Sequence, residues 1–234
     1  MTKHIGIVAI SAEGAALCYR TLVSEAQPLM GEHAHPEISL HSFSMTKHMA
    51  ALERADWQGV SELVQASAEK LVAMGAELLI CPDNTVHPAV EQVLAQSPVP
   101  WLHIAEVVAA EAAALGYRHL GLLGTGFLMA GPVYPKALAA KGIEMTLPTP
   151  EQRLGIDKRI FEELVKGHFS EATRRYFQGV IASLAQRGCD AVVLGCTEIP
   201  LLISQAEACL PVLDSTRLLA RAALAAATGG QRPD

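Results

Sequence analysis

The chain has 234 residues, of which half are hydrophobic and 18% are charged, so it can bury a sizeable core and is not intrinsically disordered. Its net charge of −6, without a long basic cluster, argues against nucleic acid as a partner, and no apolar run is long enough to cross a membrane. Five cysteines without paired spacing, and a start that does not read as a signal peptide, favour reduced thiols and a cytoplasmic location.

Strands and helices are predicted to alternate along the whole chain. The expected strands lie at 4–10, 37–43, 77–81, 100–104, 119–124, 143–147, 190–194 and 211–214. The expected helices lie at 13–28, 57–74, 86–96, 104–116, 128–141, 157–166, 171–188, 199–207 and 215–228. The runs LLI and AVVL are continuously apolar, which is typical of parallel strands that are buried on both faces.

The second half of the chain repeats the first. KHIGIVAIS, from Lys3, resembles RHLGLLGTG, from Arg118. In the same order, GAELLICPDNT resembles GCDAVVLGCTE, and VPWLHIAEVVAAEAA resembles LPVLDSTRLLARAAL. Three matches at a nearly constant offset indicate a duplication. The second match aligns Asp83 with Cys196.

These patterns predict an α/β fold with two pseudo-symmetric halves, each a four-stranded parallel sheet between two layers of helices. We expect one domain to comprise 1–104 with 208–234, because the last helix returns to the first half, and the other to comprise 105–207. Ligands of such sheets bind beyond the carboxyl ends of the strands. The active site is therefore expected in the cleft between the halves.

Polar residues follow the strands at those carboxyl ends, with Asp83 in one half and Cys196 in the other. A substrate carbon held between them would meet one proton-transferring group on each face, as inversion of a stereocentre requires. Nearby hydroxyl, amide and helix N-terminal N–H groups can hold a carboxylate without a metal. The candidate substrate-binding residues at these corners are Ser11, Asn84, Thr85, Thr125, Thr197 and Glu198.

The segments ICPDNTVH and GCTEIP contain Asp83 and Cys196, and on a duplicated chain they resemble the aspartate/glutamate racemase superfamily. The resemblance implies a cofactor-independent amino-acid racemase that needs no metal, acts on a small carboxylate or amino acid and forms a homodimer. It also implies a catalytic cysteine in each motif, which is Cys196 in the second and is replaced by Asp83 in the first. Aspartate-type members of the superfamily carry basic residues that bind the distal carboxylate of the substrate. The resemblance matches one of them to Lys47, and only Arg153 or Lys158 is available to match the second.

Both catalytic candidates have a structural alternative. An aspartate ahead of a helix often caps it or closes a turn, and Asp83 has that position. Cys81 is a second possible thiol, but its repeat partner Leu194 lies inside a strand, which indicates a core residue. Cys196 follows Gly195 at a helix start, a setting that favours the reactive thiolate over a merely buried cysteine.

Other patterns are weaker. GLLGTG with Glu144 is a partial dinucleotide fingerprint, but the third glycine is poorly placed and the first half lacks the pattern. EHAHPE matches no zinc spacing and reads as a solvated loop. His87 either supports the Asp83 corner or caps strand carbonyls. Lys47 and His48 either reach the rim of the cleft or lie in an exposed loop.

The sequence therefore predicts an isomerase that inverts the α-carbon of an amino acid by proton transfer between Asp83 and Cys196. Two alternatives stay open. One is one-sided chemistry by Cys196 alone, as in an arylmalonate-type decarboxylase or a maleate-type isomerase. The other is a non-catalytic protein that binds carboxylates.

Overall fold

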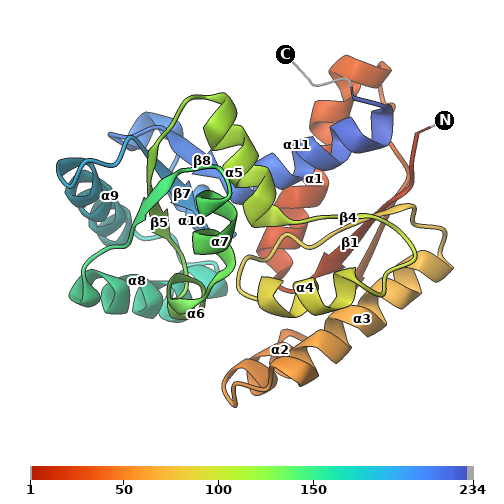
Figure 1. Ribbon diagram of the computed structural model, residues 1–234, viewed down its shortest axis with the longest axis horizontal. Helices are drawn as coiled ribbons and strands as arrows, with labels where there is room; N and C mark the ends of the chain where they lie inside the picture. The colour runs from red at the N-terminus through yellow and green to blue at the C-terminus, as the bar shows by residue number, and fades with distance from the viewer. Residues whose placement is uncertain (1, 231–234) are drawn as a thin grey trace. The chain divides into compact units, whose positions relative to one another are not determined.

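The computed structural model describes residues 2–230 and divides them into two compact units. Unit 1 comprises the described residues up to Ile104 together with those from Thr216 onward, and unit 2 runs from Ala105 to Ser215. Each unit contains one four-stranded parallel sheet flanked by helices (Figure 1). The predicted fold class is confirmed.

Unit 1 has the strand order β2-β1-β3-β4, and all pairings are parallel. Its strands are β1 (Ile5–Ala9), β2 (Ile38–Ser42), β3 (Leu78–Ile80) and β4 (Trp101–Leu102). Its helices are α1 (Ala12–Met30), α2 (Met45–Leu52), α3 (Trp57–Ala73), α4 (His87–Leu94) and all but the first residue of α11 (Ser215–Thr228). Within this unit, α1 and α11 cover one face of the sheet, and α3 and α4 cover the other (Figure 1).

Unit 2 has the equivalent order β6-β5-β7-β8. Its strands are β5 (His119–Leu123), β6 (Glu144–Thr146), β7 (Ala191–Leu194) and β8 (Val212–Asp214). Its helices are α5 (Ile104–Ala114, from its second residue), α6 (Gly126–Ala130), α7 (Val133–Ala139), α8 (Pro150–Glu162), α9 (Glu171–Gln186) and α10 (Ile199–Leu202), with 3-10 turns η1 (Leu164–Lys166) and η2 (Gln205–Glu207). The core lies between β5, β7 and the buried faces of α8 and α9.

The duplication extends to individual hydrogen bonds. In unit 1, the ring nitrogen Nε2 of His4 lies 2.9 Å from Oγ of Ser39. In unit 2, Nε2 of His119 lies 2.6 Å from Oγ1 of Thr146 at the equivalent point of its sheet. In both units the histidine at the amino end of the first strand contacts a hydroxyl on the neighbouring strand, so the two halves repeat a side-chain contact as well as a topology.

The last helix, α11, belongs to unit 1 from its second residue onward. Arg221 on α11 forms a bidentate ion pair with Glu25 on α1, at 2.7 and 2.9 Å. The chain crosses back after Ser215, however, and not after residue 207 as expected. The reason is β8, which pairs with β7 and so holds the preceding segment in unit 2.

Several helix boundaries differ from the prediction. The helix expected at 128–141 is interrupted at Gly131, where the backbone is extended, and α7 begins after Pro132. α8 begins seven residues earlier than expected, at Pro150, because Thr149 and Gln152 form a capping box. α2 was not expected at all.

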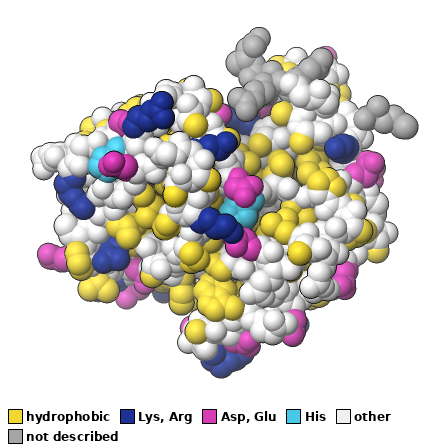
Figure 2. Space-filling model, viewed as in Figure 1, with side chains coloured by type: hydrophobic (Ala, Val, Ile, Leu, Met, Phe, Trp, Pro, Cys, Tyr) yellow, Lys and Arg dark blue, Asp and Glu magenta, His cyan; other side chains and the backbone are white. Residues whose placement is uncertain are grey.

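On the face shown in Figure 2, Lys and Arg side chains are interspersed with Asp and Glu. No helix within residues 2–230 combines the length and hydropathy that a membrane span requires.

Candidate active site

The first polar corner lies where β1 and β3 end side by side. The order β2-β1-β3-β4 changes direction between these two strands, and α/β sheets bind ligands at such a switch point. Ser11 follows β1 and caps α1, since its Oγ accepts a hydrogen bond from the N–H of Gly14 at 3.2 Å. Asp83 lies in the loop between β3 and α4. Asn84 beside it is buried, and Thr85 is half-buried.

The carboxylate of Asp83 accepts two backbone hydrogen bonds. Its Oδ1 lies 2.9 Å from the N–H nitrogen of Thr85 and 3.2 Å from that of Val86. These contacts close the turn that leads into α4. Asp83 therefore has the turn-closing role that the sequence offers as the alternative to catalysis. Donors of this kind also stabilise a carboxylate as the anion. Asp83 is half-buried, so its side chain remains partly accessible.

His87 supports this corner from behind. Its side chain is fully buried, and its Nδ1 donates to the backbone carbonyl of Asp83 at 2.7 Å. Its Nε2 accepts from the N–H of Ile104 at 3.2 Å. A carbonyl only accepts and an amide only donates, so the two contacts fix one neutral tautomer. Burial, with a further contribution from His103, lowers the pKa of His87 from 6.5 to about 3.

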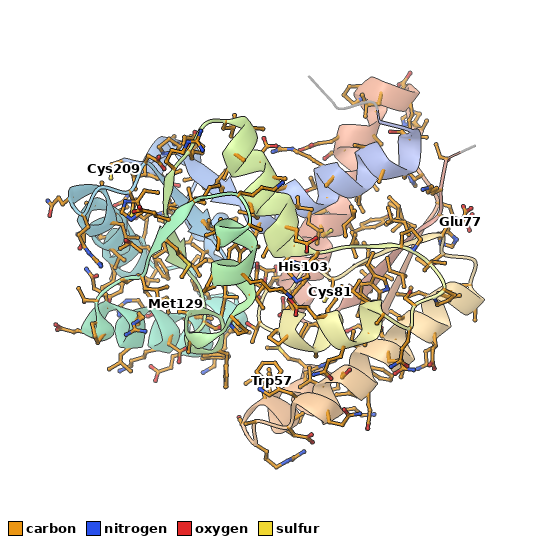
Figure 3. The ribbon with its side chains drawn as sticks, viewed as in Figure 1. Trp57, Glu77, Cys81, His103, Met129 and Cys209 are labelled. Carbon is orange, nitrogen blue, oxygen red and sulfur yellow. The ribbon has the colours of Figure 1, made fainter. Side chains whose placement is uncertain are left out.

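Cys81 lies in the interior of unit 1, in the core cluster between the sheet and its helices (Figure 3). Burial raises the pKa of its thiol, and the charge of Asp83 adds to that shift. A fully buried thiol of this kind is a core residue, in agreement with the sequence prediction.

The second polar corner follows β7 in unit 2. The Sγ of Cys196 donates to Oε2 of Glu198 at 3.0 Å, and Oγ1 of Thr197 donates to the same oxygen at 2.8 Å. All three side chains are buried. Because an ionised carboxylate can only accept hydrogen bonds, the Cys196 thiol is the donor of this contact when Glu198 is ionised.

Close packing of two strand ends shapes the second corner. The N–H of Gly195 donates to the carbonyl oxygen of Leu123 at 2.7 Å. A Cβ atom on Gly195 would lie only 2.9 Å from that oxygen, so the close approach requires glycine. The Cys196 corner and the end of β5 are thereby held together.

Thr125 follows β5 and caps α6, with its Oγ1 accepting from the N–H of Leu128 at 3.2 Å. The backbone N–H of Gly126, the residue after Thr125, donates to Oδ1 of Asp157 at 2.6 Å. Asp157 comes from α8 and was not predicted as a site residue. No motif marks it, because its role depends on a contact between elements that are distant in sequence.

The three basic candidates for binding a distal carboxylate, Lys47, Lys158 and Arg153, have different surroundings. Lys47 is exposed on α2, with its Nζ 5.2 Å from the centroid of the Phe43 ring. Lys158 on α8 is also exposed and pairs with Glu162 at 3.8 Å. The Nε of Arg153 on the same helix is buried and makes no hydrogen bond within residues 2–230. Arg153 precedes Asp157 by one turn and therefore shares the helix face that contacts the Thr125 corner.

Three weaker predictions are also resolved. Glu144 pairs with His119 at the amino end of β5, whereas Thr125 lies beyond the carboxyl end, so the dinucleotide fingerprint lacks its acidic residue at the corner. His33 and Glu32 of the EHAHPE segment are almost fully exposed, as a solvated loop predicts. His48 lies on α2 and is buried, and is therefore not part of an exposed loop.

Two units that repeat one strand order, each with a polar corner beyond its first and third strands, define an α/β protein of the two-domain racemase type. A family model described as Asp/Glu/hydantoin racemase matches residues 7–223. The chain therefore belongs to the Asp/Glu/hydantoin racemase family.

Solved structures and a curated relative agree with this assignment. A Yersinia pestis protein classed with the Asp/Glu racemases is 32% identical, with a TM-score of 0.88 over 97% of this chain and 99% of that one. An aspartate racemase homologue from Pyrococcus horikoshii is 28% identical, with a TM-score of 0.84 and the same coverage. The broad-specificity amino-acid racemase RacX of Bacillus subtilis is 22% identical over 71% of each chain. These similarities support an amino-acid racemase-like function.

Proposed function

We propose that the protein is a cofactor-independent amino-acid racemase that inverts the α-carbon by proton transfer between Asp83 and Cys196. In this proposal the two residues approach one substrate carbon from opposite faces. From the family resemblance, we further propose that the enzyme is a cytoplasmic homodimer that acts without a metal.

One observation carries this proposal. The two residues occupy equivalent positions of the repeat, yet their hydrogen bonds run in opposite directions. Asp83 accepts from two backbone N–H groups, whereas Cys196 donates to Glu198. One corner thus presents a base and the other an acid, the pair that a single inversion consumes.

The reaction follows from those two states. Asp83 removes the α-proton from one face, and the electron pair of the broken C–H bond moves into the substrate carboxylate. Cys196 donates its proton to the opposite face, and the electron pair returns to form the new C–H bond. The reverse direction starts from protonated Asp83 and the Cys196 thiolate. N–H and hydroxyl groups at the strand ends stabilise the charge that develops on the carboxylate oxygens.

The polar residues at the corners supply these contacts, and we propose that Ser11, Asn84, Thr85, Thr125, Thr197 and Glu198 bind the substrate. For an acidic substrate, Lys47 and Arg153 are the proposed partners of the distal carboxylate. Arg153 is preferred to Lys158 because its buried Nε has no partner within residues 2–230, whereas Lys158 is paired with Glu162.

A second candidate function is one-sided chemistry by Cys196, such as arylmalonate-type decarboxylation or maleate-type isomerisation. The turn contacts of Asp83 favour it, because they give that carboxylate a role that needs no proton transfer. This reaction would require Cys196 and not Asp83.

Solvent exchange separates these functions. The protein is incubated in D₂O with each enantiomer of aspartate, glutamate and a wider amino-acid panel, and loss of the α-proton is followed by NMR with chiral analysis of the product. Racemisation predicts deuterium incorporation with inversion for at least one amino acid, and none with Cys196→Ala. Turnover of an arylmalonate or of maleate, without amino-acid exchange, would instead establish the second function. Binding without any turnover would identify a non-catalytic carboxylate-binding protein.

A further inference from the structure

Both crossings of the chain between the units fall at the first residue of a helix. Ile104 begins α5 and is the last residue of the first segment of unit 1. Ser215 begins α11 and is the last residue of unit 2. The two residues also align in the repeat, one within VPWLHIAEVV and the other within LPVLDSTRLL. The crossings are therefore equivalent points of the two halves.

Each crossing is hydrogen-bonded to the polar corner of its own unit. In unit 1, His87 joins the backbone carbonyl of Asp83 to the N–H of Ile104, at 2.7 and 3.2 Å. In unit 2, the Oγ of Ser215 donates to the carbonyl of Leu194 at 2.8 Å, two residues before Cys196. Both linking side chains are fully buried.

The two links use different chemistry at equivalent places. The repeat partner of His87 is Pro200, which has no side-chain donor, and the repeat partner of Ser215 is Ile104, which has none either. The first half thus makes its link from the helix after the corner, and the second half makes it from the crossing itself. The fold alone does not dictate either bond, yet each half has one.

We propose that His87 and Ser215 are positioning residues for the reaction, each holding one proton-transferring corner against the point where the chain leaves its unit. This inference rests on the proposed function. Proton transfer requires groups placed to within a fraction of an ångström, and a displacement of about 1 Å costs on the order of 100-fold in rate. Neither side chain needs to contact the substrate, because each acts through the backbone beside Asp83 or Cys196.

The α-deuterium isotope effect on kcat/KM, measured separately for the two enantiomers, tests the proposal. When one proton-transferring group is weakened, this isotope effect rises for the enantiomer whose proton that group removes, because removal becomes the slowest step. The variants are His87→Gln for the first corner and Ser215→Ala for the second. Circular dichroism and urea unfolding serve to check that each variant is folded.

We expect His87→Gln to raise the isotope effect for one enantiomer and Ser215→Ala to raise it for the other. Each variant should lower kcat about tenfold with little change in KM, as misplacement of a reacting group predicts. His87→Asn is the matched control, because its amide nitrogen can replace Nδ1 and keep the bond to Asp83. It should recover most of the kcat that His87→Gln loses, and Ser215→Thr should do the same for Ser215→Ala.

A purely structural role would lower activity without distinguishing the enantiomers. Equal changes for both enantiomers, or a rise for the same enantiomer in both variants, would overturn the positioning roles while leaving the racemase intact. A parent protein that exchanges no α-proton with any amino acid would overturn both proposals.

Discussion

The corners at Asp83 and Cys196 occupy equivalent positions in two copies of one fold, yet the side chains take opposite parts in their hydrogen bonds. Asp83 accepts from backbone N–H groups of its own turn, while Cys196 donates to the buried side chain of Glu198. Duplication has kept the two groups at equivalent positions, whereas their hydrogen-bond partners differ. In the proposed reaction, the carboxylate in place of the thiol expected at the first corner gives the halves distinct starting roles, one as base and one as acid.

The largest expected effect comes from removing the acid. Cys196→Ala takes away the proton that the second corner supplies, and we expect racemisation to fall by about 10²–10⁴-fold, the range for loss of a general acid–base group. Chiral chromatography of the reaction mixture measures it. Cys81→Ala is the matched control, because Cys81 is a core thiol. Wild-type activity in Cys196→Ala would eliminate the acid role of this corner.

A smaller effect is expected from the acceptor beside the thiol. Glu198→Gln removes the charge that accepts from both Cys196 and Thr197, while keeping nearly the same shape. We expect kcat to fall about 10–100-fold, since a hydrogen bond to a charged group contributes about 1.5–3 kcal/mol. The fall should be greater for Glu198→Gln than for Thr197→Ser, which keeps the hydroxyl. Equal kcat in both variants would show that Glu198 has no part in the proton transfer.

The stability of the first corner is expected to depend on pH through His87. His87 is neutral in the folded protein because burial lowers its pKa from 6.5 to about 3, so the unfolded chain binds a proton that the folded chain does not. Its contribution to stability is complete above pH 6.5 and is lost as the pH falls from about 6.5 towards 3. Urea midpoints between pH 7.5 and 4 should therefore fall less steeply in His87→Asn than in the wild type. Parallel curves for the two proteins would contradict this prediction.

The smallest effect is expected far from both corners, where the halves are most alike. Ser39→Ala and Thr146→Ala each remove the hydroxyl partner of a histidine at the amino end of a sheet. We expect each to lower the free energy of unfolding by about 1 kcal/mol, the usual net value of one hydrogen bond, with unchanged kcat. Denaturant titration and activity assays test both variants. A drop in activity in either would show that these contacts reach the site.

Local patterns were sufficient to predict the strands and the two corners. Continuously apolar runs such as AVVL located the buried strands to within a residue or two, and the repeat brought Asp83 into register with Cys196. Short helices were harder. α2 is an eight-residue helix that starts after a serine without a side-chain cap bond, so no strong start signal marks it.

The contacts that give each corner its chemistry could not be read from the sequence. Asp157 reaches Gly126 across 31 positions, and His87 reaches Ile104 across 17. Such partners are set by how elements pack, which neither periodicity nor motif spacing records. The opposite hydrogen bonding of the two corners is likewise visible only once the backbone is folded around them.

Asp83→Asn tests the central claim most directly. Asparagine keeps an oxygen that can accept from Thr85 and Val86, so the turn is preserved while the proton-accepting carboxylate is lost. Racemisation of the preferred amino acid is measured in the folded variant beside the wild type. We predict a loss of about 10²–10⁴-fold with an unchanged unfolding midpoint. An Asp83→Asn protein that racemises at the wild-type rate would show that this residue only closes a turn and that the base lies elsewhere.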